Sequence, residues 1–70
     1  MSMKPLDTLG DMLGNQILVR LKNGMEIRGK LKAFDIHLNI VLENAEFTDN
    51  EVNRKFKTIF LRGDMILFVS

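Results

Sequence analysis

The chain has no cysteine and only one histidine. Without cysteine it can form neither a disulfide nor a thiolate zinc site, and one histidine is too few for a structural metal centre. No apolar run approaches the roughly 20 residues that cross a bilayer, and the first residues lack the basic and then apolar layout of a secretory signal. We therefore expect a soluble, cytoplasmic protein with no metal, no cofactor and no membrane contact.

The charge is close to balanced, with a formal net charge of +1 and both signs interleaved. Binding of nucleic acid would therefore have to come from a local group of residues, or from copies of it arranged by symmetry. We expect a single domain over residues 1–70, which buries only roughly 60% of the surface that its unfolded chain exposes. Because 46% of the residues are hydrophobic and no disulfide or metal can stabilise the core, association of copies is the device that remains.

A short amphipathic helix is predicted over residues 5–13, after a mobile end formed by residues 1–4. Proline is favoured at the first position of a helix because it needs no amide partner there, and Gly14 is a stop signal. The helix is expected to cover the open end or face of a sheet with apolar residues that recur at helical spacing, namely Leu6, Leu9, Met12 and Leu13.

From Gln16 the apolar period changes to two, which predicts strands. Asn23-Gly24 predicts a hairpin, because both residues tolerate the positive φ of its two central positions. Gly29, in the middle of the return strand, favours a sharp bend of the kind that closes a small barrel. The inner face of that strand is expected to carry Met25, Ile27, Gly29, Leu31 and Ala33, and the outer face Glu26, Arg28, Lys30 and Lys32.

Further strands are predicted over residues 40–47 and 52–61, and a last one within 65–69. The last run is apolar on both sides and would invite aggregation as an exposed edge, so we expect it to form an interface with another copy. The predicted fold is mainly β: an N-terminal helix and five strands in a strongly bent antiparallel sheet that forms a small open barrel.

A candidate recognition site lies in residues 35–39, between two of the predicted strands. In extended backbone, residues two apart point to the same side. Asp35, His37 and Asn39 would then present a carboxylate, an imidazole and a carboxamide together. Ile36 and Leu38 would turn to the other side and anchor the segment beneath.

Two stretches of the chain carry a recognisable pattern. Val19 to Gly24, Arg28 to Leu31, Asp35 to Asn39 and Leu42 to Glu46, all within residues 16–47, resemble the first Sm motif. Phe60 to Ile66, within residues 52–70, resembles the second. The chain is thus similar to the Sm-like (LSm) proteins, most closely the short archaeal type.

The resemblance implies an Sm fold and a homo-oligomeric ring, usually of seven subunits. In such a ring the fourth strand of one copy pairs with the fifth strand of the next. It also implies a non-catalytic function, the binding of single-stranded uridine-rich RNA at the inner rim in RNA processing or RNA metabolism. The RNA-binding residues that it carries over are His37, Asn39 and Arg62, with Asp35, Gly63 and Asp64 as supports.

These residue types suit the recognition of a single-stranded base, which is bound by stacking on its faces and by hydrogen bonds on its edge. His37 and Arg62 are expected to sandwich the base, and Asn39 to offer a donor and an acceptor to uracil. Asp35 is expected to fix the orientation of the Asn39 amide. Gly63 would let the backbone approach the base and donate from its amide, and Asp64 would hold Arg62.

Three other functions are alternatives to this one. A hydrolase would need a nucleophile and an oxyanion or phosphate site, and no motif supplies them. A ring-shaped protein-interaction scaffold with little RNA affinity is the serious alternative. A monomeric small barrel such as an OB-fold is the other. Mass measurement in native buffer and titration with homopolymeric RNA separate these functions.

Overall fold

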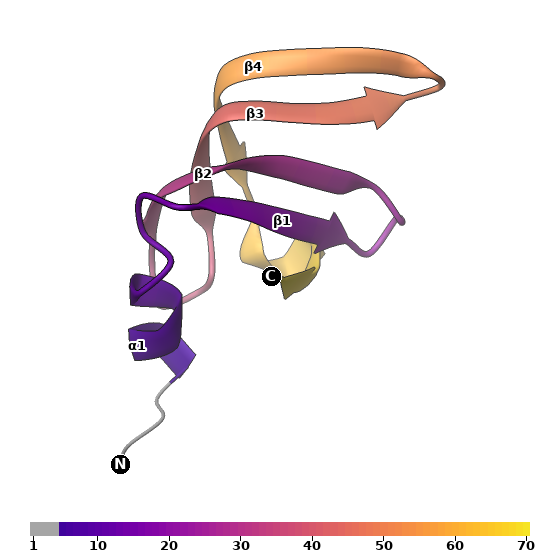
Figure 1. The fold of residues 1–70 in the computed structure, drawn as a ribbon. Coiled ribbons are helices and arrows are strands. Elements are labelled where there is room, and N and C mark those ends of the chain that lie inside the picture. Colours follow the sequence, from indigo (N-terminus) through magenta and orange to yellow (C-terminus); the bar gives the residue numbers. More distant parts are fainter. Residues whose placement is uncertain (1–4) are drawn as a thin grey trace.

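The computed structural model describes residues 5–70 as one helix followed by a single five-stranded antiparallel sheet (Figure 1). The mobile end expected for residues 1–4 lies outside the described residues. Within residues 5–70, no helix is long and apolar enough to span a bilayer. The elements are α1 Pro5–Gly10, β1 Gln16–Leu21, β2 Glu26–Phe34, β3 Ile40–Asp49, β4 Val52–Leu61, a 3-10 turn η1 Gly63–Met65, and β5 Ile66–Val69.

The strand order is β4-β3-β2-β1-β5, so β2 is the central strand and β4 and β5 are the two edges. The predicted fold class, an N-terminal helix and five antiparallel strands in a bent, open sheet, is confirmed. Figure 1 shows the β1–β2 and β3–β4 turns at one end of the sheet and α1 at the opposite end. The pairing of β1 with β5 continues one residue beyond β5, where Leu18 and Ser70 exchange backbone hydrogen bonds of 2.7 and 2.8 Å.

The sheet bends at Gly29, as the sequence predicts. The register between β2 and β3 shifts there, and the two residues Asn44 and Ala45 lie opposite the one glycine. A Cβ on Gly29 would come 3.2 Å from the Cα of Ala45, so glycine allows the two backbones to approach closely. This bulge sharpens the bend that turns a flat sheet toward a barrel.

The core lies on the inner face of the sheet and is aliphatic. The period of two in β2 correctly places Ile27, Gly29 and Leu31 inside. Ala33 was expected there and is exposed instead, because a second register shift between Leu31 and Ala33 moves the half-buried Phe34 toward the core. The buried side chains are Ile17, Val19, Leu21, Ile27, Leu31, Ile40, Leu42, Ala45 and Leu61.

The helix is shorter than predicted, since α1 ends at Gly10 rather than at residue 13. Glycine is a poor helix former, and beyond it the amides of Met12 and Leu13 bond three residues back instead of four. Leu9 and Met12 pack against the core, as expected for a cover over the sheet. Two further members of the predicted stripe are exposed, Leu6 and Leu13.

The two hairpin turns differ from expectation in detail. At Asn23-Gly24 the hairpin forms, but only Gly24 has a positive φ, of 90°. The Gly24 amide bonds to Leu21 O and the Leu21 amide to Met25 O, which is the pattern of a three-residue loop with a bulge. The two-residue turn with both central φ values positive occurs between β3 and β4 instead, at residues 50–51.

Candidate nucleic-acid interface

The β2–β3 loop, residues 35–39, is a tight turn and not the extended segment assumed from the sequence. The amide of Leu38 donates to Asp35 O at 3.0 Å, and the amide of Asp35 donates to Asn39 O at 3.1 Å. The turn closes because Leu38 adopts φ = 63°, a left-handed conformation that is uncommon for a leucine. Ile36 and Leu38 do not anchor the segment beneath it, since their exposed fractions are 74% and 45%.

The Asp35 carboxylate organises this loop. Oδ1 accepts hydrogen bonds from the backbone amides of His37 and Asn39, at 2.9 and 3.1 Å, and Oδ2 accepts one from the Asn39 side-chain Nδ2 at 3.0 Å. The expectation that Asp35 fixes the orientation of the Asn39 amide is therefore confirmed. Aspartate suits the position because an ionised carboxylate is only an acceptor and has room for several donors.

These hydrogen bonds stabilise the charged form of Asp35. The pKa of its carboxyl lies below its ordinary value of 3.8, chiefly because of the hydrogen bond from the Asn39 side chain. The amides of Asn39 and His37 and the nearby imidazole lower the pKa further, while partial desolvation opposes them. The carboxylate is thus ionised near neutral pH and holds the carboxamide in one orientation.

The second loop, which follows β4, is joined to the first through Asn39. The Gly63 amide donates to Asn39 Oδ1 at 2.9 Å, a bond between residues 24 apart in the chain. Gly63 was expected to offer this amide to a base; in this structure the amide donates to Asn39 instead. Glycine is required for a different reason: a Cβ at Gly63 would overlap the His37 carbonyl oxygen and lie 2.9 Å from Leu38 C.

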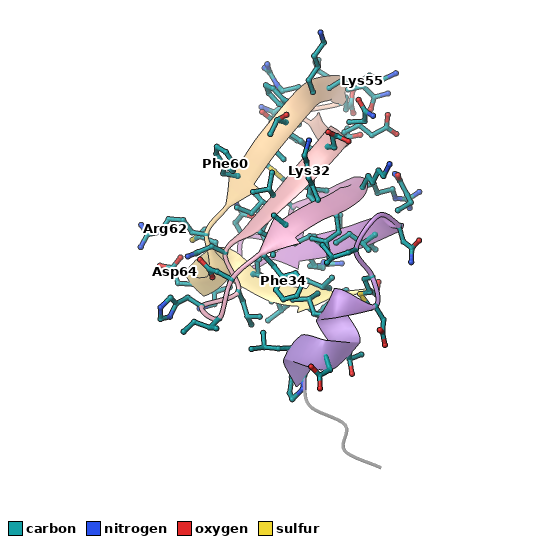
Figure 2. The ribbon with its side chains drawn as sticks, turned by 90° about the vertical axis from the view of Figure 1, so that its left-hand side faces the viewer. Lys32, Phe34, Lys55, Phe60, Arg62 and Asp64 are labelled. Atoms are coloured by element: carbon teal, nitrogen blue, oxygen red, sulfur yellow. The ribbon has the colours of Figure 1, made fainter. Side chains whose placement is uncertain are left out.

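Arg62, the first residue after β4, therefore lies directly beside the loop that carries His37. Figure 2 shows the Arg62 and Asp64 side chains next to each other, and Arg62 Nη2 lies 3.3 Å from Asp64 Oδ2. The expected contact between these two residues is confirmed. Both side chains are largely exposed, at 81% and 61%, so Arg62 remains open to a ligand. His37 is exposed as well.

A shallow pocket of about 450 Å³ adjoins this pair of loops. Asp35, Asn39 and Arg62 line one side of it, and apolar residues at the ends of β2, β3 and β4 line the rest. Phe60 stands at its edge with 78% of its surface exposed, the largest exposed fraction among the large hydrophobic residues described (Figure 2). An apolar hollow with a few convergent polar groups is typical of a site for a planar ligand.

One contributor to the site was missed from the sequence. Leu38 closes the turn through its positive φ, and nothing in a leucine signals such a conformation. Its partial signal was the Asp35–Asn39 spacing, since aspartate often bonds to a backbone amide two residues on and so favours a turn. Among residues 5–70, no group of three or more acidic or imidazole side chains could hold a metal ion.

Together these features define a class of protein: a small open β-barrel in which two loops, joined by a hydrogen bond, present a carboxamide, an imidazole and a guanidinium. The description of that class matches a known family, because the model of the LSM domain covers residues 7–70. The chain belongs to the LSM domain family.

Three relatives illustrate how similar the chain is to other members. An archaeal protein of Methanosarcina acetivorans, provisionally named an snRNP Sm-like protein, is 48% identical over 71 aligned positions, covering 100% of this chain and 99% of its own. The SmAP1 heptamer of Pyrobaculum aerophilum has a TM-score of 0.89 at 40% identity, with 100% of this chain and 95% of that chain covered. The Sm protein of Pyrococcus abyssii, solved in complex with a uridine heptamer, has a TM-score of 0.88 at 40% identity, with 97% of each chain covered.

Proposed function

We propose that this protein is a non-catalytic RNA-binding subunit that closes into a homo-oligomeric ring of seven and binds single-stranded, uridine-rich RNA at the inner rim. Residues 1–70 act as one Sm-like domain in this proposal. RNA processing or RNA metabolism in the cytoplasm is the corresponding role. The observation that carries the proposal is the Asn39 carboxamide, held at both ends by Asp35 and Gly63.

A carboxamide held in this way can distinguish uracil from cytosine. Asn39 Nδ2 has one hydrogen left to donate to a base carbonyl, and Oδ1 keeps a lone pair to accept from a ring N–H. Uracil offers that carbonyl and that N–H, whereas cytosine offers an amino group and an unprotonated ring nitrogen at the same positions. Rotation of the amide to suit cytosine would place Nδ2 against the Gly63 amide and Oδ1 against the Asp35 carboxylate. Uracil is therefore favoured.

Stacking supplies the affinity in this proposal. His37 and Arg62 belong to loops in direct contact, and both side chains are exposed. Each base stacked in this manner contributes about 1–3 kcal/mol in comparable single-strand binders. Asp64 acts as a positioning residue that orients Arg62 through their ion pair. Repetition of Arg62 around a closed ring would concentrate positive charge at the rim.

The ring itself is supported by the two edges of the sheet. β4 and β5 end the strand order, and both expose large apolar side chains among the described residues: Val52, Phe56 and Phe60 on β4, and Leu67 and Phe68 on β5. Exposed apolar edge strands promote pairing with another chain. Pairing of β4 with β5 of the next copy would satisfy both edges at once. The heptameric form of the Pyrobaculum aerophilum relative supports a ring of seven subunits.

Titration with oligouridine, oligocytidine and oligoadenine tests the RNA proposal. The parent protein should prefer oligouridine. His37→Ala, Asn39→Ala and Arg62→Ala should each weaken that binding by roughly tenfold or more, in line with the stacking energies above. Arg54→Ala is the matched control for Arg62→Ala, because Arg54 lies at the β3–β4 end of the sheet and pairs with Asp49. Equal oligouridine binding by the parent and all three site variants would refute the site.

Native mass spectrometry tests the ring. Phe68→Glu or Ile66→Glu should reduce assembly or solubility, because a charge on β5 is unfavourable in an apolar interface. Lys30→Glu, on the exposed outer face of the central strand β2, is a charge-changing control away from both edges. Intact rings in both β5 variants would contradict the edge-pairing geometry. A parent ring that binds none of the homopolymers would instead favour the protein-interaction scaffold.

A further inference from the structure

A second feature outside the two loops carries charge that the chain does not neutralise. The outer face of the central strand β2 presents Arg28, Lys30 and Lys32 at alternate positions, all exposed. Side chains two residues apart on a strand are separated by roughly 6.8 Å. The three cations therefore form a row along β2, which bends at Gly29 between Arg28 and Lys30 and ends near the β2–β3 loop.

Two carboxylates face this row from β3, and each already pairs with one lysine. Glu43 lies opposite Lys30 yet bonds to Lys32 Nζ at 2.7 Å, and Glu46 lies opposite Arg28 yet pairs with Lys55 Nζ at 3.9 Å. The hydrogen bond from Lys32 is the main reason that the pKa of Glu43 is lowered. Four cations thus share two carboxylates across β2, β3 and β4.

Arg28 and Lys30 are the surplus charges. Within residues 5–70 neither forms an ion pair or a side-chain hydrogen bond. The near-neutral net charge of the whole chain conceals this imbalance. Glu26 also lies on the outer face of β2, but it already pairs with Arg20 Nη1 at 3.4 Å. We call the row Arg28, Lys30 and Lys32 the β2 strip.

The position of the strip keeps it open when copies assemble. β2 is the central strand, two places from either edge of the sheet, so pairing through β4 and β5 does not use its outer face. Lys32 lies three residues before Asp35, so the strip begins close to the β2–β3 loop, and RNA that leaves the two loops can continue onto it.

We propose that the β2 strip binds the phosphate backbone of single-stranded RNA that extends beyond the two loops, independently of base sequence. This inference rests on the proposed RNA function and adds a second, electrostatic contact to it. Lysine and arginine on an exposed strand bind phosphates by charge and release counterions, which makes the binding strongly dependent on salt. RNA short enough to occupy only the loops does not reach the strip.

The experiment compares heptauridine with poly(U) across a range of salt concentrations. Arg28→Gln/Lys30→Gln should leave heptauridine binding unchanged and weaken poly(U) binding. The slope of log Kobs against log salt for poly(U) should become shallower by about 0.7 for each phosphate that the variant no longer neutralises. Glu46→Gln, which frees Lys55, should strengthen poly(U) binding.

Lys22→Gln/Arg54→Gln is the matched control, because it changes the net charge equally outside the strip. It should bind poly(U) like the parent protein. Equally weakened binding in the control and in the strip variant would overturn the proposal in favour of a general field effect. Unchanged poly(U) binding in the strip variant would overturn the strip and leave the loop site intact. If the parent protein binds neither RNA, the proposed function fails, and the strip fails with it.

Discussion

The β2–β3 loop and the β3–β4 turn place non-glycine residues in the same left-handed backbone region but support them in different ways. Leu38 has φ = 63°, and Asn50 and Glu51 have φ = 50° and 66°. The turn is closed by the hairpin itself, with the strand pair Asp49–Val52 directly beside it. The loop is closed by Asp35 and by a contact with Gly63, 24 residues beyond Asn39.

The left-handed residues of the β3–β4 turn are thus explained by the geometry of the hairpin, whereas Leu38 in the β2–β3 loop is explained by the site that the loop forms. A two-residue hairpin needs positive φ at both central residues whatever their identity, and glycine would serve as well or better. The loop needs its conformation because it delivers Asn39 to Gly63 and aims His37 outward. Residues held in sparsely populated backbone conformations by the surrounding structure cluster at functional sites.

Among the changes that test this difference, Gly63→Ala is expected to have the largest effect. The added methyl group overlaps the His37 carbonyl, so the two loops must separate. We expect the free energy of unfolding to fall by about 1–3 kcal/mol and oligouridine binding to be abolished. Gly10→Ala is the control, because a Cβ there meets only the Phe34 ring at an ordinary 3.8 Å. Urea unfolding and RNA titration at one protein concentration check both variants. If Gly63→Ala has the stability and the RNA affinity of the parent, the contact between the two loops is not required.

A more selective change is Asp35→Asn. The new carboxamide can still accept from the backbone amides of His37 and Asn39, but its amino group is a poor partner for Asn39 Nδ2. We expect the preference for oligouridine over oligocytidine to shrink severalfold while the chain stays folded, because a fixed charge-assisted hydrogen bond is removed. The ratio of the two dissociation constants is the measurement. An unchanged ratio would show that Gly63 alone orients the amide.

In the β3–β4 turn, Glu51→Gly should stabilise the protein. The left-handed conformation is unfavourable for a residue with a Cβ by about 1–2 kcal/mol, part of which the flexibility of glycine offsets, so a net gain of about 0.5–1 kcal/mol is expected. Val52→Gly, at the next position on β4, should destabilise the protein instead. Thermal unfolding at equal concentration compares them, and RNA binding should not change in Glu51→Gly. A loss of stability would mean that the turn is not under strain.

The smallest effect concerns pH. The folded-state pKa of Asp35 is lowered, so its contribution to stability is present above the ordinary value of 3.8 and is lost as the pH falls through the folded pKa. Asp35→Asn should therefore lower the stability by a constant amount near neutral pH, and this difference from the parent should shrink as the pH falls through the folded pKa. Stability measured against pH in the parent and in the variant tests this. Identical acid limbs would show that the carboxylate is not specifically stabilised.

Much of the fold could be predicted because its signals are local. The period of two in β2 assigned its inner face correctly as far as Leu31, and glycine at position 29 marked the bend. Ala33 was wrong because a register shift depends on the partner strand, which a single strand does not reveal. The helix was too long because the four apolar residues of its stripe outweighed Gly10 in the prediction.

In the candidate site too, features set by local sequence could be predicted, and features set by distant residues could not. The Asp35–Asn39 hydrogen bond could be predicted because both groups belong to one short segment. The bond forms across a turn, however, and not along the extended backbone from which it was predicted. The role of Gly63 could not be predicted, because it depends on the distance between two loops that only the folded sheet sets.

The Gly63 amide has a practical consequence for following this protein in solution. Its proton lies in a half-buried loop outside the regular strand pairing, yet it is bonded to the Asn39 side chain. Its hydrogen exchange rate would therefore measure how often the two loops separate, in a single resolved NMR signal. Glycine amides usually stand apart in such spectra, so this one nucleus could monitor the integrity of the whole pocket during a titration.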